Sequence, residues 1–220
     1  VTSLYPDWDD NLRQAMNKEM ELFVASIMRE DRPLTDLINA VRFNELPVSV
    51  VSVQNPRLDA EELQGKFIIL DVLAKDVDGH FYNIEMQMTR RQRWSERSMV
   101  YLSKVLASQL KSGEPYAGLK PVVGIHLLCY DLFERQDQAL WCFEMRDAQS
   151  PVIRLGRELQ LNIVELPKAD RLATAGKLPG KAALAMSALN IWITYFQHGQ
   201  EEEIMSQIAY PPVMDAMQQL

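Results

Sequence analysis

The stretch from residue 66 to residue 88 limits the possible folds of this chain most. Two runs of apolar, β-branched and aromatic residues flank the turn signal Asp-Val-Asp-Gly. This pattern is typical of a β-hairpin. We expect Gly79 to take the left-handed position that closes a three-residue loop, which pairs Asp76 with His80.

Counting back along this register places Asp71 opposite Glu85. Because side chains alternate across a strand, Asn83, Glu85 and Gln87 share one face, and Asp71 joins it. Strands this apolar are usually covered on both sides, and a buried carboxylate is costly unless it is paired or bound to a metal. Two opposed carboxylates beside the amide of Gln87 predict a Mg²⁺ site. A structural ion pair and solvent-exposed acids are the alternatives.

The same hairpin carries a resemblance to a known family. Lys66, Asp71, the acidic glycine turn and the segment Asn83-Ile-Glu-Met-Gln87 resemble the recombination-promoting nuclease and transposase family of the PD-(D/E)XK nuclease superfamily. The likeness covers about residues 20–200. It continues through Arg97, Tyr101, Gly113-Glu-Pro-Tyr116, Pro121–Ile125 and Glu165-Leu-Pro-Lys168.

The order of the expected elements predicts a sheet with helices on its faces, of the α/β or α+β class. The resemblance implies a restriction-endonuclease-like core, in which a mixed β-sheet is flanked by helices and followed by a helical C-terminal segment. A length of 220 residues fits one domain with a helical appendage, and we expect a nuclease-like domain over residues 1–180, which includes the N-terminal helices, and a helical segment over 181–220.

The resemblance also implies a catalytic set. Asp71 and Glu85 would hold Mg²⁺ or Mn²⁺ together with the backbone carbonyl of Met86. Gln87 stands where the usual superfamily signature has Lys, and this family is similar in using Gln there. Because an amide carries no charge, Gln87 can only position water or act as a ligand. Lys66 or Arg97 is then the expected cation, although Lys66 also fits a solvated lysine at the start of a strand.

After Met88 the apolar residues repeat with helical spacing, which predicts a helix over residues 95–111 that ends before Gly113. On this helix Arg97, Tyr101 and Lys104 lie three or four residues apart and form one face. A basic face with aromatic side chains can hold phosphates and stack on bases. An ordinary solvated face is the alternative, and the resemblance favours DNA contact. The expected DNA-binding residues are Arg90, Arg93, Arg97 and Tyr101.

The net charge of −7 over 220 residues argues against broad nonspecific adhesion to nucleic acid. It leaves a nuclease open, because basic residues concentrate between Arg90 and Arg97. No apolar run approaches the ~18 residues that cross a membrane, so no membrane association is expected. The two cysteines, Cys129 and Cys142, indicate reduced, packed thiols of a cytoplasmic protein, with a disulfide between strands as the alternative.

The remaining elements follow from periodicity. His126 lies inside a continuous apolar run and is expected to be a hydrogen-bonded core residue. The pattern predicts helices over 8–28, from Asp31 to about Asn44, and over 182–197. It predicts strands over 48–53, 120–131, 138–145 and 159–166, a connecting loop over 57–65, and a last helix to about Ala209 that Pro211-Pro212 breaks.

These observations favour a metal-dependent DNA endonuclease linked to recombination or mobile elements. The sequence has no glycine-rich phosphate loop, no nucleophile elbow and no zinc-ligand spacing. Two alternatives remain. One is a catalytically inactive module of the same fold that binds DNA or protein, and the other is an oligomeric interaction protein built on the Met-rich C-terminal helices. A homo-oligomer is compatible with each of them.

Overall fold

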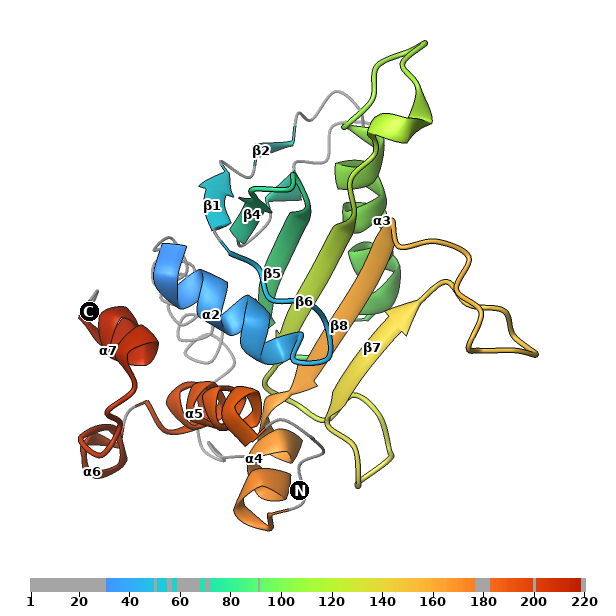
Figure 1. Cartoon of the computed structure of the whole chain (residues 1–220). Coiled ribbons are helices and arrows are strands. Elements are labelled where there is room, and N and C mark those ends of the chain that lie inside the picture. Colours follow the sequence, from blue (N-terminus) through green and yellow to red (C-terminus); the bar gives the residue numbers. More distant parts are fainter. Residues whose placement is uncertain are drawn as a thin grey trace.

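The computed structural model describes residues 31–49, 51–54, 57–58, 68–69, 72–90, 92–176, 183–199 and 201–218. The expected first helix over residues 8–28 lies outside this part of the chain. The described residues form a mixed six-stranded sheet between helices (Figure 1), which confirms the predicted fold class.

The sheet has the strand order β1-β4-β5-β6-β8-β7. The neighbours β5, β6 and β8 run parallel, and β1, β4 and β7 pair antiparallel with their neighbours. The fully buried strand β6 lies near the centre, as expected from its continuous apolar run. The strands are β1 (Val51–Gln54), β4 (Val72–Asp76), β5 (Phe81–Gln87), β6 (Val122–Leu128), β7 (Leu140–Glu144) and β8 (Leu159–Glu165).

The hairpin of β4 and β5 has the predicted register. The ladder pairs Val72 with Ile84 and Lys75 with Phe81, and the Asp76 N–H donates to the His80 carbonyl at 3.1 Å. Gly79 closes the loop with φ of 88°, in the left-handed region that glycine adopts without a steric penalty. The turn therefore fixes which side chains of β5 face which side of the sheet.

The described parts of the expected strand from residue 66 are β3 (Ile68–Ile69) and β4, which belong to different sheets. β3 pairs with β2 (Arg57–Leu58) in a separate two-stranded sheet. The expected loop over 57–65 is therefore wrong at its first two residues, because their backbone groups find partners in β3. The expected strand over 48–53 also begins late. The backbone N–H and carbonyl of Val48 bond the side chain of Asn39 and not a strand.

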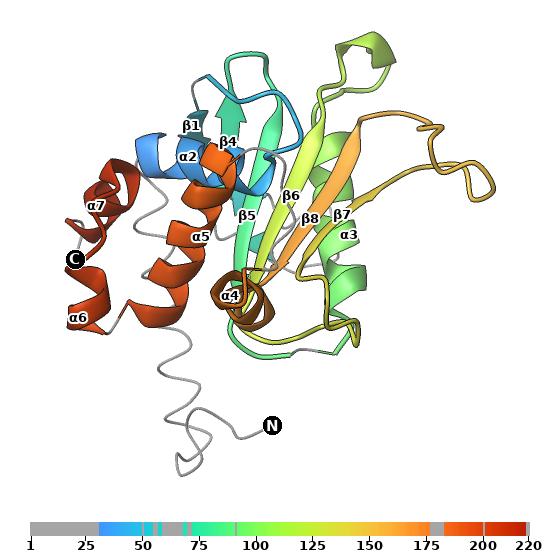
Figure 2. The same cartoon turned by 60° about the horizontal axis from the view of Figure 1, so that its bottom comes forward.

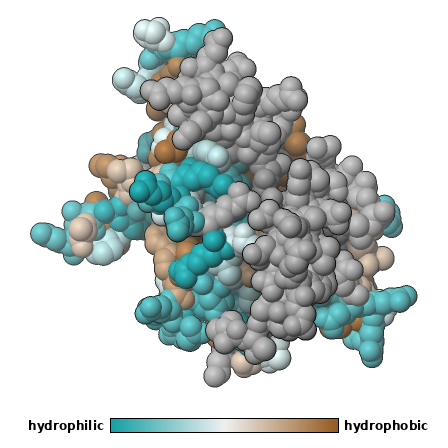
Figure 3. Space-filling view, turned by 180° about the vertical axis from the view of Figure 1, so that it is seen from behind, coloured by the Kyte–Doolittle hydropathy of each residue, from teal (hydrophilic) through white to brown (hydrophobic). Residues whose placement is uncertain are grey.

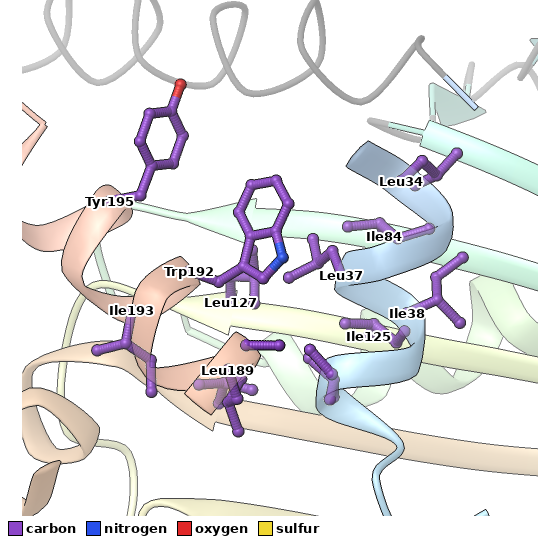
Figure 4. Close-up of a cluster of buried hydrophobic side chains, with 14 of the residues drawn as sticks. Leu34, Leu37, Ile38, Ile84, Ile125, Leu127, Leu189, Trp192, Ile193 and Tyr195 are labelled. Carbon is purple, nitrogen blue, oxygen red and sulfur yellow. The ribbon is translucent and has the colours of Figure 1, made fainter. Parts of the chain in front are cut away.

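One face of the sheet packs against α2 and α5. Figure 1 shows α2 lying across this face, and Figure 2 shows α4 and α5 on the same side. The core between them contains Leu34, Leu37 and Ile38 of α2 with Ile84 of β5 and Trp192 of α5, and these side chains interdigitate in Figure 4. The helices are α2 (Asp31–Val41), α4 (Leu166–Thr174) and α5 (Ala183–His198).

The opposite face is covered by α3 (Trp94–Ala107), which packs on β6 and β8 (Figure 2). The buried side of α3 is formed by Trp94, Ser98, Leu102 and Val105. The helix ends four residues before the predicted Lys111, and beyond its end the Gln109 side chain bonds both the N–H and the carbonyl of Lys120. Met99 is 46% exposed, and its neighbour Ser98 is buried against the sheet.

Close packing of α3 depends on Gly124 at the centre of β6. A Cβ at this position would lie 2.9 Å from Leu161 Cδ1 and 3.1 Å from Leu102 Cδ1. We expect Gly124→Ala to lower the free energy of unfolding by about 1–3 kcal/mol through overpacking, measured by urea denaturation. Ser103→Ala, on the exposed side of α3, should leave the midpoint unchanged. An unchanged midpoint for Gly124→Ala would contradict this close contact.

The C-terminal segment contains α6 (Glu202–Met205) and α7 (Pro211–Met217). The proline pair begins α7 and does not only end the preceding element, because proline suits the first turn of a helix. Asp36 of α2 accepts hydrogen bonds from Trp192 Nε1 at 2.8 Å and Tyr210 Oη at 2.7 Å, which joins α2, α5 and the start of α7. The division of the chain near residue 180 falls outside the described residues and stays a prediction. No described helix is long and apolar enough to cross a membrane.

Candidate active site

Three polar side chains form a row on β5. Asn83, Glu85 and Gln87 face the α3 side of the sheet, because Tyr82, Ile84 and Met86 belong to the core on the other side. The three polar residues are 1%, 3% and 5% exposed. Glu85 is therefore a buried carboxylate, which excludes the alternative of a solvated acidic face at this position.

The oxygen atoms of this row suit a hard cation. Asn83 Nδ2 donates to Glu85 Oε1 at 3.4 Å. Within the described part of the chain, Asn83 Oδ1 and Gln87 Oε1 are buried and have no hydrogen-bond partner. A buried acceptor without a partner costs about 1–3 kcal/mol, so these oxygens call for a water molecule or a cation. Carboxylate and amide oxygens are the ligands that Mg²⁺ prefers, so the residues present fit a divalent metal.

The partner expected for Glu85 is Asp71. Asp71 and Lys66 lie outside the described residues, and their predicted roles remain predictions. The described ladder reaches Val72 opposite Ile84, one pair before the predicted pair of Asp71 with Glu85. The register from which that pair was counted is thus the one that the hairpin adopts.

The expected DNA-binding residues lie at the start of α3. Arg97 is half-buried, and its guanidinium lies 5.8 Å from the ring centre of Tyr101. Arg93 is exposed in the left-handed conformation at the N-terminus of α3, with φ of 56°. Arg90 is held further away, where its Nη2 donates to the Leu132 carbonyl at 3.0 Å. The structure thus brings Arg97 and Tyr101 together, and it engages Arg90 with the loop after β6.

The face of the molecule opposite to that in Figure 1 is mainly hydrophilic over its described residues, with small apolar patches (Figure 3). A family model described as PD-(D/E)XK nuclease family transposase matches residues 25–220. The chain belongs to this family. A second family model, described only as a protein of unknown function, matches residues 2–44. No curated protein and no solved structure matches the chain.

Membership in the PD-(D/E)XK nuclease transposase family supports a nuclease-type function. The mixed sheet is consistent with the fold of these nucleases. Gln87, which the resemblance aligns with the usual signature Lys, lies on the same face as Glu85. Its amide oxygen is one of the two buried oxygens of this row that have no hydrogen-bond partner among the described residues.

Sequence reasoning missed the contact between Glu85 and His126. His126 lies opposite Glu85 in the parallel pair of β5 with β6, and its Nδ1 faces Glu85 Oε2 at 3.5 Å. Ser98 Oγ lies 3.0 Å from its Nε2, which confirms the prediction of a hydrogen-bonded core histidine. Burial lowers the pKa of His126 to about 3, and the charge of Arg97 acts in the same direction. No sequence signal gives the register of two parallel strands that are separated by a helix.

A second group of possible metal ligands lies in the hairpin turn, at the other end of β5. Asp76, Asp78 and His80 each offer a ligand atom within 4.8 Å of the others. The carboxylate of Asp76 is already engaged by the backbone N–H of His80, the ring of His80 and the hydroxyl of Tyr82, at 2.8–2.9 Å. Burial raises the pKa of Asp76, but these hydrogen bonds outweigh burial and hold the pKa below its ordinary value. The turn therefore stabilises itself without an ion.

Glu165 and Lys168 form a buried ion pair at the end of β8. Lys168 Nζ donates to Glu165 Oε2 and to the Phe133 carbonyl, both at 2.8 Å. The carboxylate also accepts from Trp141 Nε1 at 2.6 Å and from the Phe133 N–H at 2.8 Å. This arrangement joins β7, β8, α4 and the loop after β6. Glu165 therefore has a structural role.

Neither cysteine forms a disulfide, in agreement with the prediction of reduced thiols. Cys129 is half-buried, and its Sγ lies 3.3 Å from Met88 Sδ. Cys142 on β7 is exposed, so the prediction that its side chain is packed is wrong. β7 is the last strand of its sheet, and its residues are only partly covered.

Proposed function

We propose that this protein is an endonuclease that hydrolyses phosphodiester bonds of DNA with Mg²⁺ or Mn²⁺. Asp71, Glu85 and the backbone carbonyl of Met86 hold the metal. The observation that carries the proposal is the buried row on β5, where Glu85 lies between two amide oxygens without partners in the described structure. When bound, the metal would supply an activated water and neutralise charge on the scissile phosphate.

Other residues would orient water, supply positive charge and contact the DNA. Gln87 orients a water molecule through its free amide oxygen. The guanidinium of Arg97 on α3, whose charge acts on His126 beside Glu85, supplies the positive charge that the missing signature Lys would give, and Lys66 is the second candidate for that role. Arg93 and Tyr101 extend the contact along the DNA backbone, because cations bind phosphates and aromatic rings stack on bases. Arg90 contributes at the edge of this surface.

The family description, which includes the word transposase, supports a link to recombination or to mobile elements. We also propose that the protein is cytoplasmic and that it forms a homo-oligomer. An inactive module that binds DNA or protein is the second candidate. It is favoured by one observation, which is that Gln87 replaces the signature Lys on the face of Glu85.

Cleavage of plasmid DNA in Mg²⁺ tests the proposal. The native chain is expected to nick or linearise the plasmid, whereas Asp71→Ala and Glu85→Ala are expected to leave it intact. Asp78→Ala is the matched control, because it removes a carboxylate from the same hairpin at its other end. Equal cleavage by all four proteins would remove the assignment. Absence of both cleavage and Mn²⁺ binding by the native chain would favour the inactive module.

The DNA surface can be tested separately from catalysis. We expect Arg97→Ala to weaken binding of a catalytically silent Asp71→Ala background to duplex DNA. The slope of log K against log salt should fall by about 1, as for the loss of one phosphate contact. The measurement is fluorescence anisotropy over a series of salt concentrations. Arg135→Ala, which removes an exposed arginine that is paired with Asp137, should leave the slope unchanged. The same result for Arg97→Ala would exclude Arg97 from the DNA contact.

A further inference from the structure

A buried chain of polar groups connects α3 to the row on β5. His126 is at the centre of this chain, fully buried on β6 between Glu85 and α3. Its Nε2 lies 3.0 Å from Ser98 Oγ, and its Nδ1 lies 3.5 Å from Glu85 Oε2. The edge of the ring contacts Trp94, with ring centres 5.1 Å apart and planes at 87°. The imidazole is therefore restrained from two elements at once.

The arrangement decides where the ring proton lies. A neutral imidazole has one N–H donor and one nitrogen acceptor. A lone pair on Nδ1 would face the carboxylate of Glu85 and be repelled by it, so the proton belongs on Nδ1. Nε2 then carries no proton and can only accept a hydrogen bond, so the hydroxyl of Ser98 donates to it. The separation of 3.5 Å is longer than an ordinary hydrogen bond, so the contact is a charge–dipole contact at this distance.

We propose that His126 is a positioning residue, whose Nδ1–H holds the carboxylate of Glu85 while Ser98 fixes the ring from α3. The role in metal binding rests on the proposed function, whereas the geometry of the chain does not. Ser98 is on the helix that carries Arg97 and Tyr101, so the same chain aligns the DNA-facing helix with Glu85. Groups that orient metal ligands commonly change metal affinity by about 10–100-fold when they are removed.

The tautomer of His126 tests the inference in the metal-free protein. Long-range ¹H–¹⁵N spectra of the ¹⁵N-histidine-labelled chain report which ring nitrogen carries a proton, and His126→Gln assigns the signals. We expect a neutral ring with the proton on Nδ1, and a shift of the Nε2 resonance in Ser98→Ala. A proton on Nε2, a doubly protonated ring, or an unchanged Nε2 resonance in Ser98→Ala would overturn the inference.

Binding of Mn²⁺, measured by calorimetry, tests the consequence for the site. His126→Leu is expected to weaken binding by about 10–100-fold, and His126→Gln, which keeps an N–H donor, should recover part of the loss. Val122→Ala is the control, because it removes buried volume from the same strand and face without approaching Glu85. Equal affinity of His126→Leu and the native chain would overturn the positioning role. If the native chain binds no Mn²⁺, the proposed function fails, and the tautomer alone decides the inference.

Discussion

Glu85→Gln is expected to abolish the stabilisation of the protein by Mg²⁺ or Mn²⁺ and to lower DNA cleavage by about 100-fold or more, because metal catalysis supplies several kcal/mol. A ligand that binds only the native state raises its stability by about 2.7 kcal/mol at 100 times its Kd. The native chain should therefore show a higher Tm when metal is added, and the variant should not.

Differential scanning calorimetry with and without Mn²⁺ measures this difference. Asp78→Asn is the matched control, because it neutralises an exposed carboxylate of the other group of possible ligands in the same hairpin. This control should keep the full response to metal. A metal response that survives in Glu85→Gln, or that disappears in Asp78→Asn, would contradict the assignment of the metal to Glu85.

Lys168→Met is expected to lower the free energy of unfolding by about 3–5 kcal/mol. It leaves the carboxylate of Glu165, which is fully buried, without its cation. The loop after β6 would also lose the hydrogen bond from Lys168 Nζ to the Phe133 carbonyl. Urea denaturation, followed by tryptophan fluorescence, gives the free energy of unfolding.

The double variant Glu165→Gln/Lys168→Met separates the charge from the packing. It should recover part of the lost stability, because no uncompensated charge then remains in the core. Arg135→Met breaks the exposed pair with Asp137 and should leave the denaturation midpoint unchanged, since water screens that pair. A loss for Lys168→Met no larger than that of the exposed control would show that the buried pair is not important for stability.

The features predicted correctly from the sequence are those that local chemistry determines. Gly79 alone satisfies the positive φ of the hairpin loop, so the register of β4 with β5 could be counted from it. The continuous apolar run predicts that β6 is covered on both faces. The alternation along β5 predicts that Glu85 and Gln87 share a side of the sheet, and both are buried there.

The features that were missed depend on contacts between distant segments. Val48 looks like a strand residue, but the side chain of Asn39 satisfies its backbone. α3 ends before Gln109, whose side chain bonds the backbone of Lys120 eleven residues away. The contact of His126 with Glu85 follows from the parallel register of two strands separated by a helix. No periodicity within either segment reports such pairings.

The most direct test of the metal site is an anomalous difference map from a crystal soaked in Mn²⁺. We expect a peak that is bound by the carboxylate oxygens of Glu85 and Asp71 and lies close to the amide oxygen of Gln87. A peak at Asp76, Asp78 and His80 with none beside Glu85 would contradict it.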